Sequence, residues 1–292
     1  MKKYTKLGLA VSVAGASALA LAGYSSADSA HRALPDASIA QRVDVTSVNY
    51  PLESYRLDAD QEKKIVQAID ELTVRCMKDF GITYKPVPST GDGGLESSHK
   101  HLYGVTDEEE ARKYGYGNPD LGKEIEKQST GETSEELAVR IGEVSTYNGK
   151  AVPENGCQGQ ASKQVFREQS PEQSEAFTDE LILQASAQTQ RDPRVREVFQ
   201  KWNACMKKKG FTYSTPLEAL DDSEFASPSA TKHEKNVAVA DAQCKKKNNV
   251  TGVWSSVEMA YQNQAIGDNS ARLASVRASL QKNLQSAARI NK

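Results

Sequence analysis

The chain has 292 residues and a formal net charge of −2, with 26% charged and 7% aromatic residues. This slightly acidic balance argues against a protein that binds nucleic acid through a general excess of positive charge. The low aromatic content and the presence of only 10 prolines favour helices over a β-sandwich or a β-barrel. The length suits one large domain or two small ones.

The N-terminus has the features of an export signal. Three lysines precede an apolar stretch at residues 7–22, which is short and weakly hydrophobic for a membrane span. We expect residues 1–27 to be a signal peptide that is cleaved after Ala22 or Ala27, and an uncleaved N-terminal anchor is the alternative. Cleavage would remove three of the 37 basic side chains, leaving 34 against 39 acidic ones, and would leave no integral membrane span.

The end of this stretch resembles the signal of a bacterial lipoprotein. Leu21-Ala22-Gly23 normally precedes the lipidated cysteine, but here the next residue is Tyr24, and the first cysteine is Cys76. A phenol cannot replace the thiolate that lipidation requires. We therefore expect a protein that is secreted or loosely associated with the outer cell surface, with no lipid anchor at Tyr24. The motif is either the remnant of a lipoprotein signal or a coincidence.

Residues 28–57 mix polar and small side chains without periodicity, which predicts a flexible tether. After it we expect a first helical module at residues 58–169, which contains an inserted loop, and a second at residues 170–292, which includes the C-terminal helices. We expect the modules to form one continuous body, and a division into two domains near Ser170 is the alternative.

An internal repeat defines these modules. The sequence CMKDFGITY begins at Cys76 and CMKKKGFTY begins at Cys205, so Cys, Met, Lys, Gly, Thr and Tyr recur at the same offsets. Each copy follows apolar residues at intervals of three, four and seven, which is typical of one face of a helix.

Both repeated helices have predicted ends. Asp58 is placed to cap the first, and Asp192, which a proline follows, is placed to cap the second. Gly81 and Gly210 lie where a helix needs a left-handed residue to end. The Ile-Thr-Tyr and Phe-Thr-Tyr sequences after the glycines predict short extended segments.

The four cysteines predict two disulfides, because an even number in an exported chain is typical of disulfide bonding. Metal binding is the alternative, but the spacings of 81, 48 and 39 residues differ from the close pairs of zinc sites. Each repeat and its downstream cysteine would form a self-contained module. We therefore expect the pairs Cys76–Cys157 and Cys205–Cys244.

Further helices are predicted outside the repeat. Thr106 and Glu109 form a capping box in the inserted loop. Another helix is expected to open at Ser170 and to continue to about Gln190.

The C-terminal region carries an amphipathic stripe from Val253 to Ala287, which predicts a long helix or a helical hairpin broken at residues 267–270. Together these features predict an all-α fold of two related, disulfide-stapled helical modules.

Three features resemble one group of proteins: the LALAG sequence at residues 19–23, the two CM-x-x-x-G-[IF]-T-Y units, and YGVTDEEEARKYGYG at residues 103–117. By these features the chain resembles a group of uncharacterised exported proteins and lipoproteins of high-GC Gram-positive bacteria (actinobacteria). The resemblance covers most of the mature chain, although the group's lipidated cysteine is replaced by Tyr24. It implies an exported protein and indicates no particular activity.

No catalytic residue, metal or cofactor is expected. The sequence contains no G-x-S-x-G or H-E-x-x-H motif and no P-loop. The histidines are His31, His99, His101 and His233. His99 and His101 offer two metal ligands from one loop, but no further ligand occurs at a telling spacing, so polar loop residues are expected.

Two groups of residues are candidate binding surfaces. Tyr103, Tyr114 and Tyr116 alternate with glycines and form a candidate ligand surface; alternatively, they pin the inserted loop onto the helices. The second group is two lysine triplets, which a Cys205–Cys244 bond would bring together. They either offset the negative ends of two helices or bind an anionic partner such as wall teichoic acid or lipid headgroups. The triplets are Lys207, Lys208, Lys209, Lys245, Lys246 and Lys247.

We therefore expect an exported, envelope-associated binding or interaction protein with a cell-wall polymer or an envelope protein as its partner. A ligand-binding component of a transporter is one alternative, but it would need two α/β lobes around a cleft. A cell-wall hydrolase is the other, and it would need converging carboxylates.

Overall fold

A computed structural model describes residues 33–41, 43–44, 48–87, 102–117, 131–166, 174–225 and 229–291. The expected signal peptide, Tyr24, His31, His99 and His101 lie outside these residues. The chain separates into residues 1–34 and residues 35–292, and every helix and strand described below belongs to the second part.

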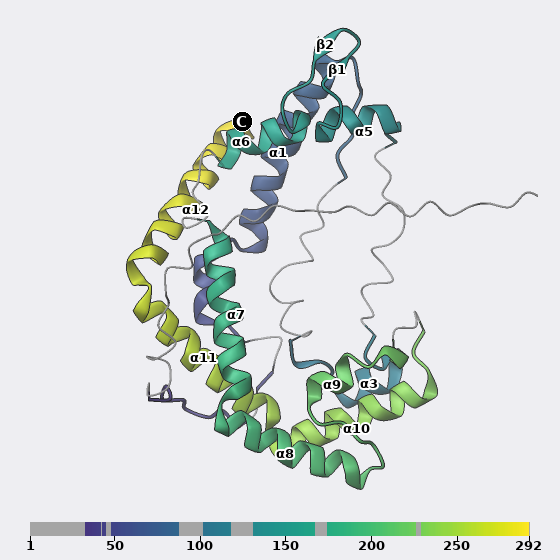
Figure 1. Ribbon diagram of the computed structural model, residues 1–292, viewed down its shortest axis with the longest axis vertical. Coiled ribbons are helices and arrows are strands. Elements are labelled where there is room, and N and C mark those ends of the chain that lie inside the picture. Colours follow the sequence, from purple (N-terminus) through teal and green to yellow (C-terminus); the bar gives the residue numbers. More distant parts are fainter. Residues whose placement is uncertain are drawn as a thin grey trace, which may run out of the picture. The chain divides into compact units, whose positions relative to one another are not determined.

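The described residues form ten α-helices, two short 3-10 helices and one two-stranded sheet, which confirms the predicted all-α fold (Figure 1). Up to residue 166 the elements are η1 (Pro51–Tyr55), α1 (Ala59–Asp79), α3 (Glu108–Tyr114), α5 (Ser134–Ile141), β1 (Thr146–Tyr147), β2 (Lys150–Ala151) and α6 (Gly156–Phe166). From residue 174 they are α7 (Glu175–Arg191), α8 (Pro193–Lys208), α9 (Pro216–Leu220), η3 (Ser223–Phe225), α10 (Lys232–Asn248), α11 (Val250–Asp268) and α12 (Ser270–Ile290). Strands β1 and β2 pair in antiparallel orientation.

The predicted ends of the two repeated helices are confirmed. The Asp58 side chain accepts a hydrogen bond from a backbone N–H in the first turn of α1, and Asp192 does the same for α8, where Pro193 is the first residue. Each helix stops before a glycine with positive φ, +79° at Gly81 and +88° at Gly210. Because a side chain would strain the backbone in this conformation, glycine is the residue that suits both helix ends.

Of two other predicted helix starts, one differs in the structure and one lies outside the described residues. Asp107, and not Thr106, caps α3, because its carboxylate accepts hydrogen bonds from two backbone N–H groups in the first turn. A carboxylate at this position also interacts favourably with the positive end of the helix. The start predicted at Ser170 lies outside the described residues, and α7 is described from its N-terminal flanking residue Ser174.

The C-terminal stripe forms two consecutive helices, α11 and α12, which meet at Asn269 within the predicted break. Helix α11 packs on α7 and α8, whereas α12 packs on α1 and α6. The two helices therefore extend over different parts of the molecule, although both also pack on α7, where Leu273 of α12 meets Phe177 and Leu181.

Parts of the flexible tether predicted at residues 28–57 are packed against the helices. Leu52 has no exposed surface. Upstream, the backbone N–H of Ala40 donates to Ser256 Oγ at 3.0 Å, and its carbonyl oxygen accepts from Asn249 Nδ2 at 2.8 Å. These contacts join the backbone of Ala40 to the side chains of Ser256 in α11 and of Asn249 just before it, so they need no apolar periodicity in the docked segment.

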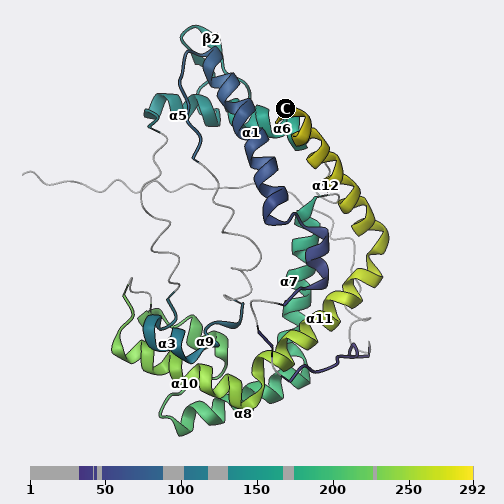
Figure 2. The same cartoon turned by 180° about the vertical axis from the view of Figure 1, so that it is seen from behind.

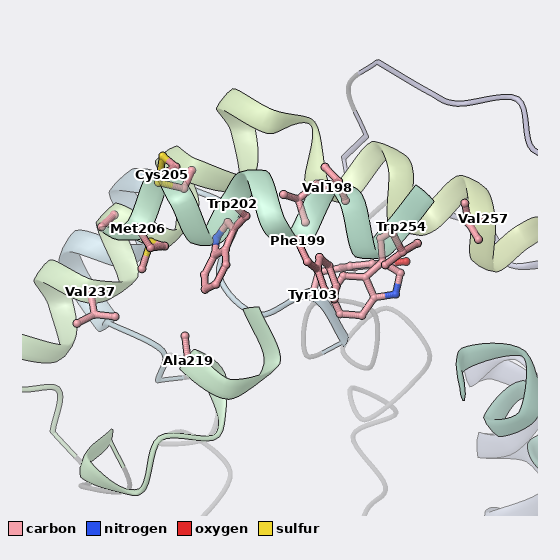
Figure 3. Packing of buried hydrophobic residues seen from close by; sticks show 14 of the residues in the cluster. Tyr103, Val198, Phe199, Trp202, Cys205, Met206, Ala219, Val237, Trp254 and Val257 are labelled. Atoms are coloured by element: carbon pink, nitrogen blue, oxygen red, sulfur yellow. A yellow bond between two sulfur atoms is a disulfide. The ribbon is translucent and has the colours of Figure 1, made fainter. Parts of the chain in front are cut away.

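The largest hydrophobic core involves residues of α7, α8, α10 and α11. Figure 3 shows Phe199, Tyr103 and Trp254 packed together at its centre. The rings of Tyr103 and Phe199 both meet Trp254 edge-on, with centroid distances of 4.9 and 5.1 Å. Trp202, one turn along α8 from Phe199, is also fully buried. The chain therefore places both of its tryptophans in this core.

Elements of the two predicted modules pack across the module boundary. Helix α3, from the inserted loop of the first module, packs on α10 of the second, and both views of the ribbon show them side by side (Figures 1 and 2). In the opposite direction, Leu284 and Ala287 of α12 pack with Ile65 and Ala68 of α1. The two modules are thus linked by packing as well as by the chain.

Candidate functional site

The two disulfides have the pairing that the repeat predicts. Cys76 near the end of α1 is bonded to Cys157 in the first turn of α6, with a Cα–Cα distance of 5.6 Å. Cys205 near the end of α8 is bonded to Cys244 near the end of α10, with a Cα–Cα distance of 5.7 Å. The second bond brings the C-terminal ends of two helices together.

Five of the six predicted lysines are exposed where these two helices end. We call them the lysine face: Lys207, Lys208, Lys209, Lys246 and Lys247. Cations at this position interact favourably with the negative end of a helix. The ammonium of Lys209 donates to Gln243 Oε1 at 2.6 Å. The disulfide therefore gathers five exposed positive charges around one covalent link.

Lys245 is not part of this face, which corrects the prediction of six surface lysines. Its side chain is only 2% exposed. The ammonium donates to Asp241 Oδ2 at 2.7 Å and to the carbonyl oxygens of Tyr103 at 2.6 Å and Val105 at 3.1 Å. Its three donors are thus all satisfied within the protein, so it is unavailable to a partner.

Asp241 is the centre of a buried polar network. Besides Lys245, it accepts hydrogen bonds from Trp202 Nε1 at 2.9 Å and from the Tyr116 hydroxyl at 3.0 Å. Complete burial raises the pKa of Asp241, and the neighbouring ammonium and hydrogen-bond donors act in the opposite direction. The network ties α8, α10 and the inserted loop to one carboxyl group.

The three candidate tyrosines do not form a common exposed surface. Tyr103 is 1% exposed, and its hydroxyl is hydrogen-bonded to that of Tyr50. Tyr116 is half-buried, stacks on Phe225 at a centroid distance of 5.4 Å and donates to Asp241. Burial raises the pKa of Tyr116, and the charge of Asp241 adds to the effect. The prediction of a tyrosine ligand surface is therefore corrected. Tyr103 and Tyr116 pin the inserted loop onto the helices, and Tyr114 is half-buried on α3.

A glycine allows the loop to approach α10 closely. Gly115 has φ of +66°, and a Cβ atom there would lie 2.5 Å from Glu234 Oε1. The same carboxylate oxygen accepts a hydrogen bond from the backbone N–H of Tyr116 at 3.0 Å. Glu108 of α3 lies beside the lysine face, since it accepts from Gln243 Nε2 at 2.9 Å and Gln243 in turn accepts from Lys209. The lysine face therefore has the carboxylate of Glu108 at one side.

Glu258 in α11 is a buried carboxyl group that belongs to none of the predicted sites. It is 1% exposed, and its Oε2 atom has no hydrogen-bond partner. Its Oε1 atom accepts a hydrogen bond from Gln262 Nε2 at 3.4 Å. Burial raises the pKa of Glu258 to about 7, against weaker effects of Gln262 and Thr189. The sequence feature that could have indicated its burial is that Glu258 is the one charged residue in the segment from Val250 to Ile266.

Other site types are not found in the described part of the chain. No group of three His, Cys, Asp or Glu side chains there is arranged to hold a metal ion. His233 is exposed and packs against Phe211 and Phe225. A surface cavity of about 370 Å³ lies beside α1 and contains none of the predicted site residues. It is lined by Gln67, Asp70, Glu71, Val74 and Pro86.

No helix within the described ranges combines the length and the apolar composition that crossing a membrane requires. Comparisons of the chain with protein-family models, with curated proteins and with solved structures found no match.

Proposed function

We propose that this protein is an exported binding protein that attaches to anionic polymers of the cell wall through the lysine face. One observation carries this function: five exposed lysines surround the Cys205–Cys244 bond in a chain whose net charge is −2. A local cluster of positive charge on a slightly acidic protein favours a localised anionic ligand over general attraction to polyanions.

The disulfide supports the binding role because it fixes the distance between two sets of lysines. With 5.7 Å between the Cα atoms of the cysteines, the ends of α8 and α10 cannot separate. The two helix ends alone would explain some of the lysines, since cations stabilise a helix C-terminus by about 0.3–1 kcal/mol. A disulfide-bonded helical protein is consistent with a location outside the cytoplasm.

Retention on purified cell walls tests the proposal. Each lysine near an anionic surface contributes about 1 kcal/mol, so replacing all five by Gln is expected to weaken retention at least about tenfold. Retention of the unmodified protein is expected to fall as salt rises from about 0.1 M to about 1 M, where the screening length falls from about 10 Å to about 3 Å.

A matched variant controls for the loss of charge. It replaces five exposed lysines of other helices by Gln and is expected to be retained like the unmodified protein. Equal losses for the two variants, retention that ignores salt, or binding to anionic lipid vesicles but not to walls would contradict the proposal. The control lysines are Lys63, Lys64, Lys78, Lys163 and Lys282.

We also propose that the mature chain carries no lipid anchor at Tyr24, which lies outside the described residues. The unmodified protein is expected in the medium or in a salt wash of cells, without label from a radioactive lipid precursor. Tyr24→Cys is expected to become labelled and membrane-bound, because Leu21, Ala22 and Gly23 already precede the new thiol. Labelling of the unmodified protein would contradict the expectation.

A further inference from the structure

Residues 48–55, which include η1, form a short segment that covers one side of α11, and we call it the strap. The backbone N–H of Leu52 donates to Gln262 Oε1 at 3.1 Å. Leu52 itself is buried among Phe177, Leu181 and Leu273. The strap is thus attached to α11 by one buried hydrogen bond and by the packing of Leu52, while Tyr50 packs in the main core and its hydroxyl bonds that of Tyr103.

Glu258 is connected to the strap through Gln262. The amide group of Gln262 donates to Glu258 Oε1 at 3.4 Å and, through its oxygen, accepts from Leu52 at 3.1 Å. The charge of Glu258 also acts on the Tyr50 phenol, whose pKa is raised first by burial and then by Glu258 and Glu53. The carboxyl group and the strap therefore influence each other directly.

The groups around Glu258 offer little compensation for a negative charge. The strap contributes the phenol of Tyr50, on which the charge of Glu53 also acts, and α7 contributes the neutral hydroxyl of Thr189. The 102–103 segment contributes the buried hydroxyl of Tyr103, which bonds Tyr50. No hydrogen bond or ion pair links Glu258 to a Lys or Arg in the described residues. Residues of α8, α10 and α12 supply no charged group that acts on it there.

The nearest charged pair along the helix is already occupied. Asp192, between α7 and α8, is bonded to Arg194 at 2.7 Å and accepts from the Tyr261 hydroxyl at 3.1 Å. Since Arg194 is engaged with Asp192, it does not neutralise Glu258. An ionised Glu258 is therefore a buried charge with one oxygen unpartnered, which is costly unless water reaches it.

We infer that Glu258 makes the strap a pH-sensitive latch: the neutral carboxyl group allows the strap to dock on α11, and the ionised carboxylate drives it open. The strap is the element that opens because η1 has five residues and only Val48 and Tyr50 of the strap reach the main core, whereas α7, α8 and α11 have 16 to 19 residues each and supply many residues of that core. Short segments with few buried contacts open most easily.

Hydrogen exchange at the Leu52 amide tests the latch in the full-length protein. The docked carboxyl group has a pKa of about 7, and we expect it to regain its ordinary pKa of 4.5 when the strap opens. Linkage between protonation and opening then predicts roughly 30-fold more opening at pH 8.5 than at pH 5.5. This difference is measured after correction for the intrinsic pH dependence of exchange. Glu258→Gln keeps the shape of the side chain without the charge and is expected to show no such increase.

Glu53→Gln is the matched control, because Glu53 is a strap carboxylate that accepts from the backbone N–H of Tyr50 at 2.9 Å. This variant is expected to retain the pH dependence of Leu52. Equal protection at both pH values in the unmodified protein, or the same increase in Glu258→Gln, would overturn the latch.

A second measurement on the unmodified protein keeps the test independent of the variants. The carboxyl carbon of Glu258, followed by NMR, is expected to titrate with a pKa of about 7 and with the same midpoint as Leu52 exchange. A midpoint below pH 5, or a midpoint that differs from that of the exchange, would also overturn the latch.

Discussion

At the scale of single residues, Lys245 shows how an apparent surface charge becomes structural. Its ammonium is enclosed by Asp241 and two backbone carbonyl oxygens. The Lys triplet suggested a single solvated run, but Asp241 lies four residues before Lys245, which is the spacing of an ion pair within a helix. That spacing was a usable signal for one lysine facing inward.

Replacing Lys245 by Met is therefore expected to be costly. The Asp241 carboxylate would remain buried with only Trp202 and Tyr116 as donors, and loss of one partner of a buried ion pair typically costs about 3–5 kcal/mol. Lys246→Met, at an exposed position, is expected to change the free energy of unfolding by less than about 0.5 kcal/mol. Urea unfolding measures both, and equally small effects would show that the buried pair is absent.

Glu258 gives the stability of the whole fold a pH dependence. Its folded pKa of about 7 lies above the ordinary 4.5, so the folded state holds the proton more tightly. The associated stability is present below pH 4.5 and is lost as pH rises towards 7. Between pH 5 and pH 8 the unmodified protein is expected to lose about 2–3 kcal/mol more than Glu258→Gln in urea unfolding. Identical pH profiles would contradict this assignment.

At the scale of elements, two glycines of α11 differ in what surrounds them. A Cβ atom at Gly252 would lie 2.2 Å from the carbonyl oxygen of Ala40 and 2.3 Å from Asn249 Oδ1. A Cβ atom at Gly267 would meet no atom within 4 Å. The first glycine therefore leaves room for the docked N-terminal segment, whereas the second has no such role.

Alanine substitutions at these glycines are expected to have opposite effects. Gly252→Ala should lower the free energy of unfolding by about 1–3 kcal/mol, because the Ala40 backbone must move away. Gly267→Ala should raise it by up to about 1 kcal/mol, because alanine favours a helix more than glycine does. Thermal unfolding of both variants measures the difference. A stabilising Gly252→Ala would mean that residues near Ala40 are not docked on α11.

Some features of the elements could be predicted from patterns in the sequence, and others could not. Helix ends were predictable where the local geometry favours one residue type. An aspartate caps the start of the helix at Asp58 and Asp192, and a glycine with positive φ follows its end at Gly81 and Gly210. The disulfide pairing followed from the repeat. The docking of Ala40 was not predictable, because the contacts come from side chains more than 200 positions away.

The candidate site was predictable only in part, for a related reason. The lysine face follows from two triplets and one disulfide, so its existence was visible in the sequence. Whether Lys245 or Tyr103 faces inward depends on the inserted loop lying on α10, which periodicity does not encode. Glu258 was missed because burial by a distant strap leaves no pattern near residue 258.

At the scale of the whole molecule, packing across the module boundary determines how residues 35–292 unfold. Helix α3 of the first predicted module packs on α10, and α12 packs on α1 and α6. Unfolding of either module would therefore expose apolar surface of the other. We expect a single cooperative transition in which the two modules lose their structure together.

Two probes report on the modules separately. Trp202 and Trp254 both lie in the second predicted module, so their fluorescence follows that part alone, whereas far-UV circular dichroism follows all the helices. The urea transitions measured by the two probes are expected to coincide. Ala287→Asp would place a charge against α1, at a fully buried position of α12, and should shift both transitions together by several kcal/mol. Ala288→Asp is the exposed neighbour and should leave both within about 1 kcal/mol of the unmodified protein. If Ala287→Asp instead lowers the dichroism transition and leaves the fluorescence transition in place, the modules unfold independently, since the tryptophan core would then not sense damage at α1.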